Sequence, residues 1–131
     1  MKCLDTDLLI AILRGKEEAR EAAADLDEES RAATTFVNAF ELFFGANRSA
    51  RKNENVKEAS RLLERLVVFP LDLSSSRIAA EISTKLLAKG DAIDYRDAMI
   101  AAITINNGAA LYTFDLKHFS PLKALGLKLF P

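Results

Sequence analysis

Apolar residues along this chain follow two patterns, short continuous runs and helical spacing, which predict strands and helices in alternation. Short apolar or β-branched runs occupy residues 3–4, 31–35, 67–69, 109–114 and 127–130. Between them, apolar residues recur at three- and four-residue spacing, as in amphipathic helices, over residues 8–13, 16–29, 35–44, 55–66, 74–89 and 94–106. Strands separated by helices favour a parallel sheet with right-handed crossovers. The pattern therefore predicts an α/β fold.

Turn and capping residues set the expected ends of these helices. Glycine commonly ends a helix, so we expect Gly15, Gly45 and Gly90 to end the first, third and fifth of them. The three serines at residues 74–76 offer an N-cap for the fifth helix. Asp94 is expected to start the sixth.

Composition narrows the class of protein further. The 131 residues have the length of one domain, so we expect residues 1–131 to form a single domain. Half of the residues are apolar and 28% are charged, which is typical of globular proteins and not of disordered chains. The longest apolar stretch, residues 98–103, is far shorter than the roughly 20 residues that span a bilayer. No stretch near Met1 resembles a signal peptide, and Cys3 is the single cysteine, so we expect a cytoplasmic protein without disulfides.

Carboxylates in unusual positions are the main functional signal. Asp5 directly follows the first strand, and Asp115 directly follows the strand that ends at Phe114. Because ligands of open α/β sheets bind at the carboxyl ends of the strands, both acids should emerge at the same edge. Each could instead cap the helix or turn that follows it, as aspartate often does. The residues alone leave both alternatives open.

Two further acids occur on predicted helices. Glu41 lies at the margin of an apolar stripe, where an ionised carboxylate needs a metal ion, an arginine or a set of hydrogen-bond donors. The stripe consists of Phe36, Val37, Phe40, Phe43 and Phe44. Asp97 opens the run 98–103, which is apolar on every side and therefore expected to be buried. There it could stabilise the helix dipole, with Asp94 as the N-cap, or reach the strand ends.

Together, the four acids point to a metal site. They are Asp5, Glu41, Asp97 and Asp115. Acids that converge on one edge repel each other strongly unless cations lie between them, and ligand sets made only of oxygen select Mg²⁺ or Mn²⁺. Such an ion supports phosphodiester hydrolysis. The net charge of −1 excludes a generally basic surface, so a nucleic acid would be held by the metal or by a local patch such as residues 48–52.

Four short stretches carry a resemblance to a known family. They are Leu4-Asp5-Thr6-Asp7 with Leu9-Ile10, Glu41-Leu42 with Gly45, Asp97-Ala98-Met99-Ile100-Ala101-Ala102, and Thr113-Phe114-Asp115 with His118-Phe119. In order, spacing and total length they resemble the PIN domain, and specifically the VapC-type toxins of bacterial and archaeal toxin–antitoxin pairs. The resemblance covers nearly the whole chain. Its specificity comes from the four stretches together, since no single one is distinctive.

This resemblance implies a three-layer α/β/α fold with a central, mostly parallel sheet of four to five short strands, and a metal-dependent endoribonuclease activity. By the family pattern, Asp5 and Asp97 are the main Mg²⁺ or Mn²⁺ ligands, and Glu41 and Asp115 complete the acidic site. It also implies a homodimer, an RNA substrate and inhibition by a VapB-like antitoxin that lays a helix or tail across the active-site groove. The chain departs from the family at position 7, which is Asp where Asn is usual. Whether Asp94 caps its helix or binds metal stays open.

Two other interpretations compete with this one. Asp5-Thr6-Asp7 after the first strand also resembles the nucleophile motif of haloacid dehalogenase-type phosphatases. Their later acidic motif should follow a strand, whereas Asp91 and Asp94 precede a helix, and Glu41 and Asp115 would have no role. The second alternative is a catalytically inactive PIN-like module that only binds a partner. Such a module should bind no more than trace Mn²⁺.

Overall fold

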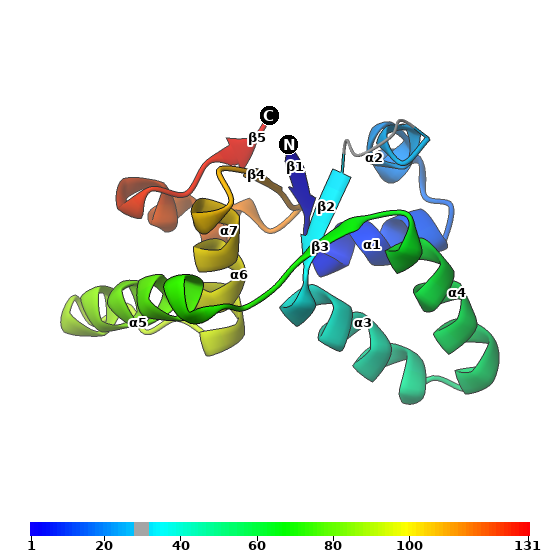
Figure 1. The fold of residues 1–131 in the computed structure, drawn as a ribbon, viewed down its shortest axis with the longest axis horizontal. Helices are drawn as coiled ribbons and strands as arrows, with labels where there is room; N and C mark the ends of the chain where they lie inside the picture. Colours follow the sequence, from blue (N-terminus) through cyan, green and yellow to red (C-terminus); the bar gives the residue numbers. More distant parts are fainter. Residues whose placement is uncertain (28–31) are drawn as a thin grey trace.

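The computed structural model describes residues 1–27 and 32–131, and these ranges contain a five-stranded sheet in which each pair of neighbouring strands is parallel. The strand order is β3-β2-β1-β4-β5. The strands are β1 (Lys2–Leu4), β2 (Ala32–Thr35), β3 (Val67–Phe69), β4 (Ala110–Tyr112) and β5 (Leu129–Phe130). Since the strands are parallel, the carboxyl ends of β2, β1 and β4 lie side by side at the centre of one edge (Figure 1).

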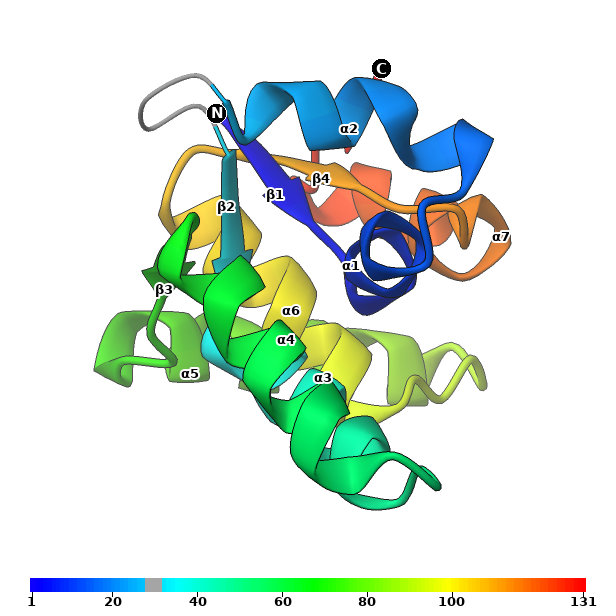
Figure 2. The same ribbon diagram turned by 90° about the vertical axis from the view of Figure 1, so that its right-hand side faces the viewer.

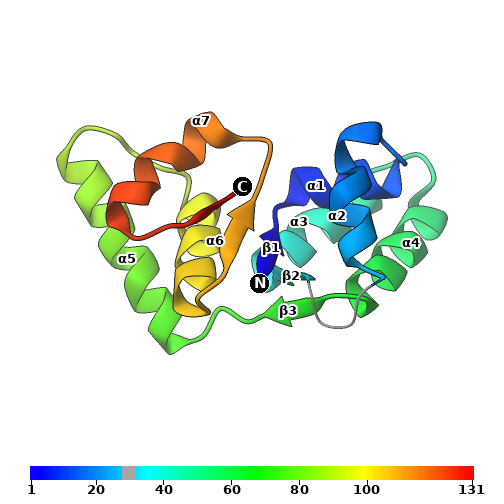
Figure 3. The same cartoon turned by 90° about the horizontal axis from the view of Figure 1, so that it is seen from above.

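Helices connect the strands and cover both faces of the sheet (Figure 2). They are α1 (Thr6–Leu13), η1 (Glu17–Ala19), α2 (Arg20–Asp25), α3 (Phe36–Asn47), α4 (Lys52–Glu64), α5 (Leu73–Ala88), α6 (Tyr95–Asn106), α7 (Leu116–Phe119) and η2 (Ser120–Leu125), where η marks a 3₁₀-helix. Viewed from above, α5, α6 and α7 lie on one side of the central strands, and α1, α2 and α4 lie on the other (Figure 3). In the described ranges, no helix is both long and apolar enough to cross a bilayer.

Successive side chains of a strand point to opposite faces, and this alternation divides the core into two clusters. Leu4 and its neighbour Tyr112 pack against the cluster formed with α1, α2 and α4. Leu111 packs into the cluster formed with α5, α6 and η2. Each core therefore fills one space between the sheet and a helical layer. The predicted three-layer α/β/α fold with a parallel sheet is confirmed.

Several predicted helix ends are wrong. The third helix does not stop at Gly45 but continues to Asn47, because nothing in the local backbone requires a turn there. The fifth helix is capped by Asp72, in a reciprocal capping box with Ser75, and not by the serines alone. The helix expected over residues 16–29 is shorter and split into η1 and α2, and its last two residues lie outside the described residues.

The aromatic stripe on α3 is only partly buried, because Val37 and Phe43 pack against the two core clusters and the other three residues are exposed. Phe36, Phe40 and Phe44 are 56%, 57% and 52% exposed. The buried face of α3 carries Asn38, Leu42 and Ala46 instead, since that face packs against neighbouring helices. Because α3 buries only one face, the three exposed phenylalanines lie on its other face.

Candidate active site

The fold gathers the four predicted acids at the carboxyl edge of the sheet. Asp5 directly follows β1, and Asp115 lies on the turn after the adjacent strand β4. Glu41 reaches this edge from the middle of α3, where it accepts a hydrogen bond of 2.7 Å from the Thr6 hydroxyl. Asp97 lies in the first turn of α6. The predicted convergence of separate segments on one edge is therefore observed.

Asp5 is the most tightly held of these acids. Its Oδ1 accepts hydrogen bonds of 2.9 Å from the Thr6 amide and from Asn38 Nδ2, and its Oδ2 accepts one of 2.7 Å from the Thr113 hydroxyl. Burial raises the pKa of Asp5, while these donors act in the opposite direction. Among the described residues, no lysine or arginine forms an ion pair with it. Its orientation is therefore fixed by neutral groups.

A buried amide joins the acids into one network. Asn38 accepts a hydrogen bond of 2.7 Å from the Thr35 hydroxyl and donates to both Asp5 Oδ1 and Thr6 Oγ1 at 2.9 Å. Because Thr6 then donates to Glu41, its hydroxyl is oriented at both ends. The sequence analysis missed Asn38. Its only sequence signal is a position three residues after Thr35, the N-cap of α3.

Asp7 lies behind this edge and holds the loop after β4. Its Oδ2 accepts a hydrogen bond of 3.0 Å from the Phe114 amide, and its Oδ1 is buried without a partner among the described residues. Burial and the charge of Asp5 raise the pKa of Asp7 to about 6. The extra acid at position 7 therefore adds negative charge close to the predicted metal ligands.

Of the four candidate acids, Asp97 has the fewest hydrogen-bond and ion-pair partners among the described residues. In the part of the chain that the structure describes, its carboxylate has no hydrogen bond and no ion pair. Burial, followed by the charges of Asp5, Asp94, Glu41 and Asp115, raises its pKa to about 6. Since charges act over distance, this shift shows that Asp97 lies within the field of all the other predicted site acids.

Asp94 caps the helix that carries Asp97. Its side chain accepts a hydrogen bond of 2.8 Å from the Arg96 amide, and the Arg96 guanidinium approaches the same carboxylate at 3.2 Å and 3.3 Å. These contacts hold the pKa of Asp94 below its usual range. Between the two roles that the sequence left open, the structure shows the helix cap.

Glu41 and Asp115 have partners other than acids. The Arg96 Nη1 atom lies 3.6 Å from Glu41 Oε2, so an arginine does approach Glu41 as one sequence alternative proposed, in addition to Thr6. His118 Nδ1 lies 2.7 Å from Asp115 Oδ2. This contact was not predicted, although His118 follows Asp115 by one helical turn.

The donor set suits a hard divalent cation. It consists of carboxylate oxygens, with Asp97 unpartnered among the described residues. Burial, followed by neighbouring negative charge, raises the pKa of both Asp97 and Asp7. Within residues 1–27 and 32–131, however, no three acid, histidine or cysteine side chains are already grouped as ion ligands. Asp115 faces His118, and Glu41 faces Thr6 and Arg96, so these side chains would exchange partners on binding an ion.

Comparisons with known proteins agree on one family. The model of the PIN domain matches residues 2–123. The tRNA(fMet)-specific endonuclease VapC of Salmonella typhimurium is 25% identical over 125 residues, which cover 95% of this chain and 94% of the relative. Ribonuclease VapC2 of Rickettsia felis is 30% identical over 88 residues, which cover 67% of this chain and 66% of the relative. The crystal structure of DNA-bound VapBC from Salmonella typhimurium superposes with a TM-score of 0.87 at 25% identity, covering 98% of this chain and 96% of that one.

Proposed function

Because the chain belongs to the PIN domain family, we propose that it is an endoribonuclease that depends on Mg²⁺ or Mn²⁺ and hydrolyses RNA phosphodiester bonds in the cytoplasm. We further propose that it is the toxin of a type II toxin–antitoxin pair. The relatives named tRNA(fMet)-specific endonuclease and ribonuclease support the activity, and their VapC names support the toxin role. A phosphatase of the haloacid dehalogenase type is not supported, since the family model that matches residues 2–123 is that of the PIN domain.

The observation that supports the metal dependence is the half-buried carboxylate of Asp97, which has no hydrogen bond or ion pair among the described residues and lies at the start of α6. Asp5 and Asp97 are the proposed main ligands, and Glu41 and Asp115 complete the acidic site. When bound, a divalent ion would polarise a phosphoryl oxygen and lower the pKa of an attacking water. A catalytically inactive binding module would not need these gathered carboxylates, because their mutual repulsion destabilises the fold when no cation is bound.

The neutral residues of the site position these ligands. Thr113 and Asn38 bond opposite oxygens of Asp5, so its carboxylate cannot rotate freely. The Thr6 hydroxyl holds Glu41 Oε1 in the same way. Since donors that are fixed before substrate binds need no reordering during the reaction, this network prepares the site for catalysis.

Asp97→Asn tests the function directly. The variant should keep the fold and lose Mg²⁺-dependent RNA cleavage, because an amide cannot supply the charge that the ion needs. Cleavage of a labelled RNA is followed on a gel, and folding by circular dichroism. Asp91→Asn, in the exposed loop before α6, removes the same charge and should cleave like the unmodified protein. RNA cleavage that persists in Asp97→Asn, or in excess EDTA, contradicts the proposal.

The proposed antitoxin would lie beside Glu41. A hollow of about 250 Å³ between α1, α3 and α4 has an apolar floor and reaches this acid. Its floor includes Ile10, Leu13, Leu42, Ala46 and Ala59, and Arg14 and Glu58 lie at its rim. An amphipathic helix binds such a groove through its apolar face. A bound segment there would block access to the acidic site.

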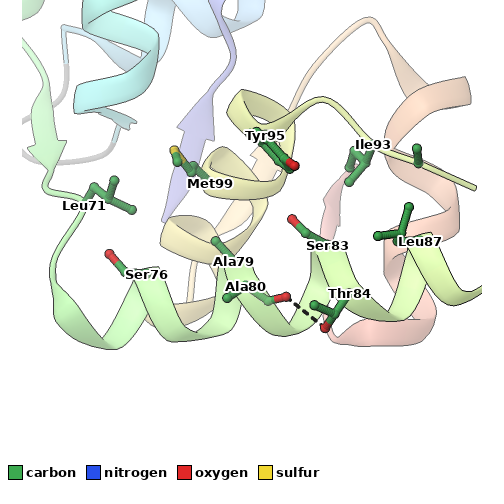
Figure 4. A pocket seen from close by; sticks show the side chains of 11 residues that line it. Leu71, Ser76, Ala79, Ala80, Ser83, Thr84, Leu87, Ile93, Tyr95 and Met99 are labelled. Carbon is green, nitrogen blue, oxygen red and sulfur yellow. Dashed lines mark hydrogen bonds between the residues drawn. The ribbon is translucent and has the colours of Figure 1, made fainter.

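The proposed homodimer would use the apolar surface of α3, α5 and α6. A groove of about 430 Å³ lies between α5 and α6, and it is lined by Leu71, Ala79, Leu87, Ile93, Tyr95 and Met99 (Figure 4). The half-exposed phenylalanines of α3 offer on the order of 300 Å² of ring surface. With the exposed groove residues, each copy offers roughly 600 Å², close to the roughly 800 Å² per partner of a stable interface. A two-fold axis would place the phenylalanines of α3 of each copy against the groove of the other copy. This surface therefore suits a second copy of the chain.

A further inference from the structure

Arg96 is an arginine that contacts the acidic site directly. Within the described ranges, it is the only lysine or arginine that forms an ion pair with one of the four candidate acids. Its guanidinium spans two elements, since Nη2 lies 3.2 Å from Asp94 Oδ2 on the turn before α6 and Nη1 lies 3.6 Å from Glu41 Oε2 on α3. It therefore bridges α3 and the turn before α6 at the edge of the acidic site.

These contacts hold Arg96 weakly. Its side chain is 56% exposed, and ion pairs in water contribute little because solvent and salt screen them. The contact with Glu41 is longer than a hydrogen bond. Arg96 is also the second residue of α6, where the positive end of the helix dipole disfavours a cation. The guanidinium can therefore exchange these carboxylates for a phosphate at a small cost in free energy.

Two other arginines near the end of α3 have contacts of their own. Arg51 pairs with Glu54 on the next helix, and the Arg48 guanidinium lies 5.5 Å from the centre of the Phe44 ring. Phosphate that approaches the site meets the carboxylates of Asp5 and Asp97. A cationic side chain beside them would attract it in addition to the proposed metal ion.

We propose that Arg96 binds the RNA phosphate at the acidic site, and that Glu41 and Asp94 hold its guanidinium there until RNA arrives. This inference rests on the proposed ribonuclease function and adds a substrate-binding residue to it. Guanidinium matches two phosphate oxygens with two parallel N–H groups, which a lysine ammonium cannot do. Asp94 then has a second role besides capping α6, because its carboxylate keeps the Arg96 guanidinium close to the acidic site.

Salt dependence distinguishes a phosphate contact from a structural one. RNA binding is measured by fluorescence anisotropy in Ca²⁺ over a range of salt, with two RNA probes of different sequence whose integrity is checked on a gel. Each phosphate contact on a single strand adds about 0.7 to the slope of log affinity against log salt. Arg96→Gln should weaken binding to both probes about tenfold and reduce the slope by that amount. Arg96→Lys should keep the slope and lose part of the affinity.

The matched control is Arg61→Gln, on the exposed face of α4, which removes the same charge away from the site. It should leave both affinity and slope unchanged. An unchanged slope in Arg96→Gln, with a normal circular dichroism spectrum, overturns the proposal for Arg96 and leaves the nuclease function intact. If the unmodified protein binds the probes with the predicted slopes but cleaves no RNA in Mg²⁺ or Mn²⁺, the nuclease function fails and the Arg96 contact stands. Absence of any RNA binding would overturn both.

Discussion

At the scale of single residues, the acidic site combines one satisfied carboxylate with one unsatisfied carboxylate. Asp5 has three donors on its two oxygens, whereas Asp97 has none among the described residues. Burying either negative charge raises the energy of the folded state. Hydrogen-bond donors reduce that cost for Asp5 but not for Asp97. A site that is prepared for a cation should therefore be a source of instability when the cation is absent.

This imbalance predicts how stability changes with pH in the absence of metal. An unfolded chain ionises aspartate near pH 4, whereas folded Asp97 keeps its proton until about pH 6. The folded state binds more protons over that interval, so stability falls as pH rises from about 4 to about 6. Asp97→Asn should raise the free energy of unfolding near neutral pH by roughly 1 kcal/mol, a figure reduced for the solvent exposure of the group.

Urea unfolding in EDTA, near pH 4 and near neutral pH, measures this effect. The gain in Asp97→Asn should be present at neutral pH and absent at the acidic value. Asp91→Asn serves as the control and should show no such difference. An equal gain at both pH values would mean that the Asp97 charge does not destabilise the fold.

At the scale of secondary-structure elements, the sequence predicted what depends on local pattern. Residues 67–69 were expected as a strand and form β3, and Asp94 was expected to start the sixth helix and is its N-cap. Residues 116–125 were not expected to be helical, because two short turns carry no periodicity that could be detected. The exposed face of α3 could not be predicted either, since burial there depends on which neighbours pack against it.

The candidate acids of the site could also be recognised from local pattern, whereas their hydrogen-bond partners could not. Acids directly after strands or beside apolar helical runs are unusual and therefore informative, so the sequence alone singled out the four candidate acids, whose role stays a prediction. Thr6, Asn38 and Thr113 were not identified as partners of the acids, because such residues are frequent in caps and turns. Arg96 was overlooked as well. Only the fold shows that the first turn of α6 faces Glu41.

Gly45 gives a test at this scale, since it was expected to end α3 and lies inside it. A Cβ added there meets no atom within 4 Å, and the backbone is not left-handed. Gly45→Ala should therefore stabilise the protein by about 0.5–1 kcal/mol, because alanine loses less backbone entropy in a helix.

Thermal and urea unfolding check this prediction. Gly90→Ala is the matched comparison, because Gly90 follows α5 with a φ of 78°, which favours glycine. That variant should be destabilised. A destabilised Gly45→Ala would show that α3 ends earlier than the structure indicates.

At the scale of the whole molecule, large apolar side chains are exposed on α3 and line the groove between α5 and α6. If two copies bury it, Phe40→Ser should shift the protein from dimer to monomer in size-exclusion chromatography with light scattering, because Phe40 lies in the middle of the stripe. Leu116→Ser, which removes an exposed side chain on α7, should leave the mass unchanged. A chain that is monomeric without any substitution would contradict the proposed homodimer.

The hydrogen bond between the Thr113 hydroxyl and Asp5 joins residues 108 positions apart in sequence. Strand β4, which precedes Thr113, also pairs directly with β1. A nascent chain that has not yet been translated as far as β4 therefore has its first acid but neither the strand nor the hydroxyl that orients it. The proposed nuclease can therefore become active only after translation has passed residue 113.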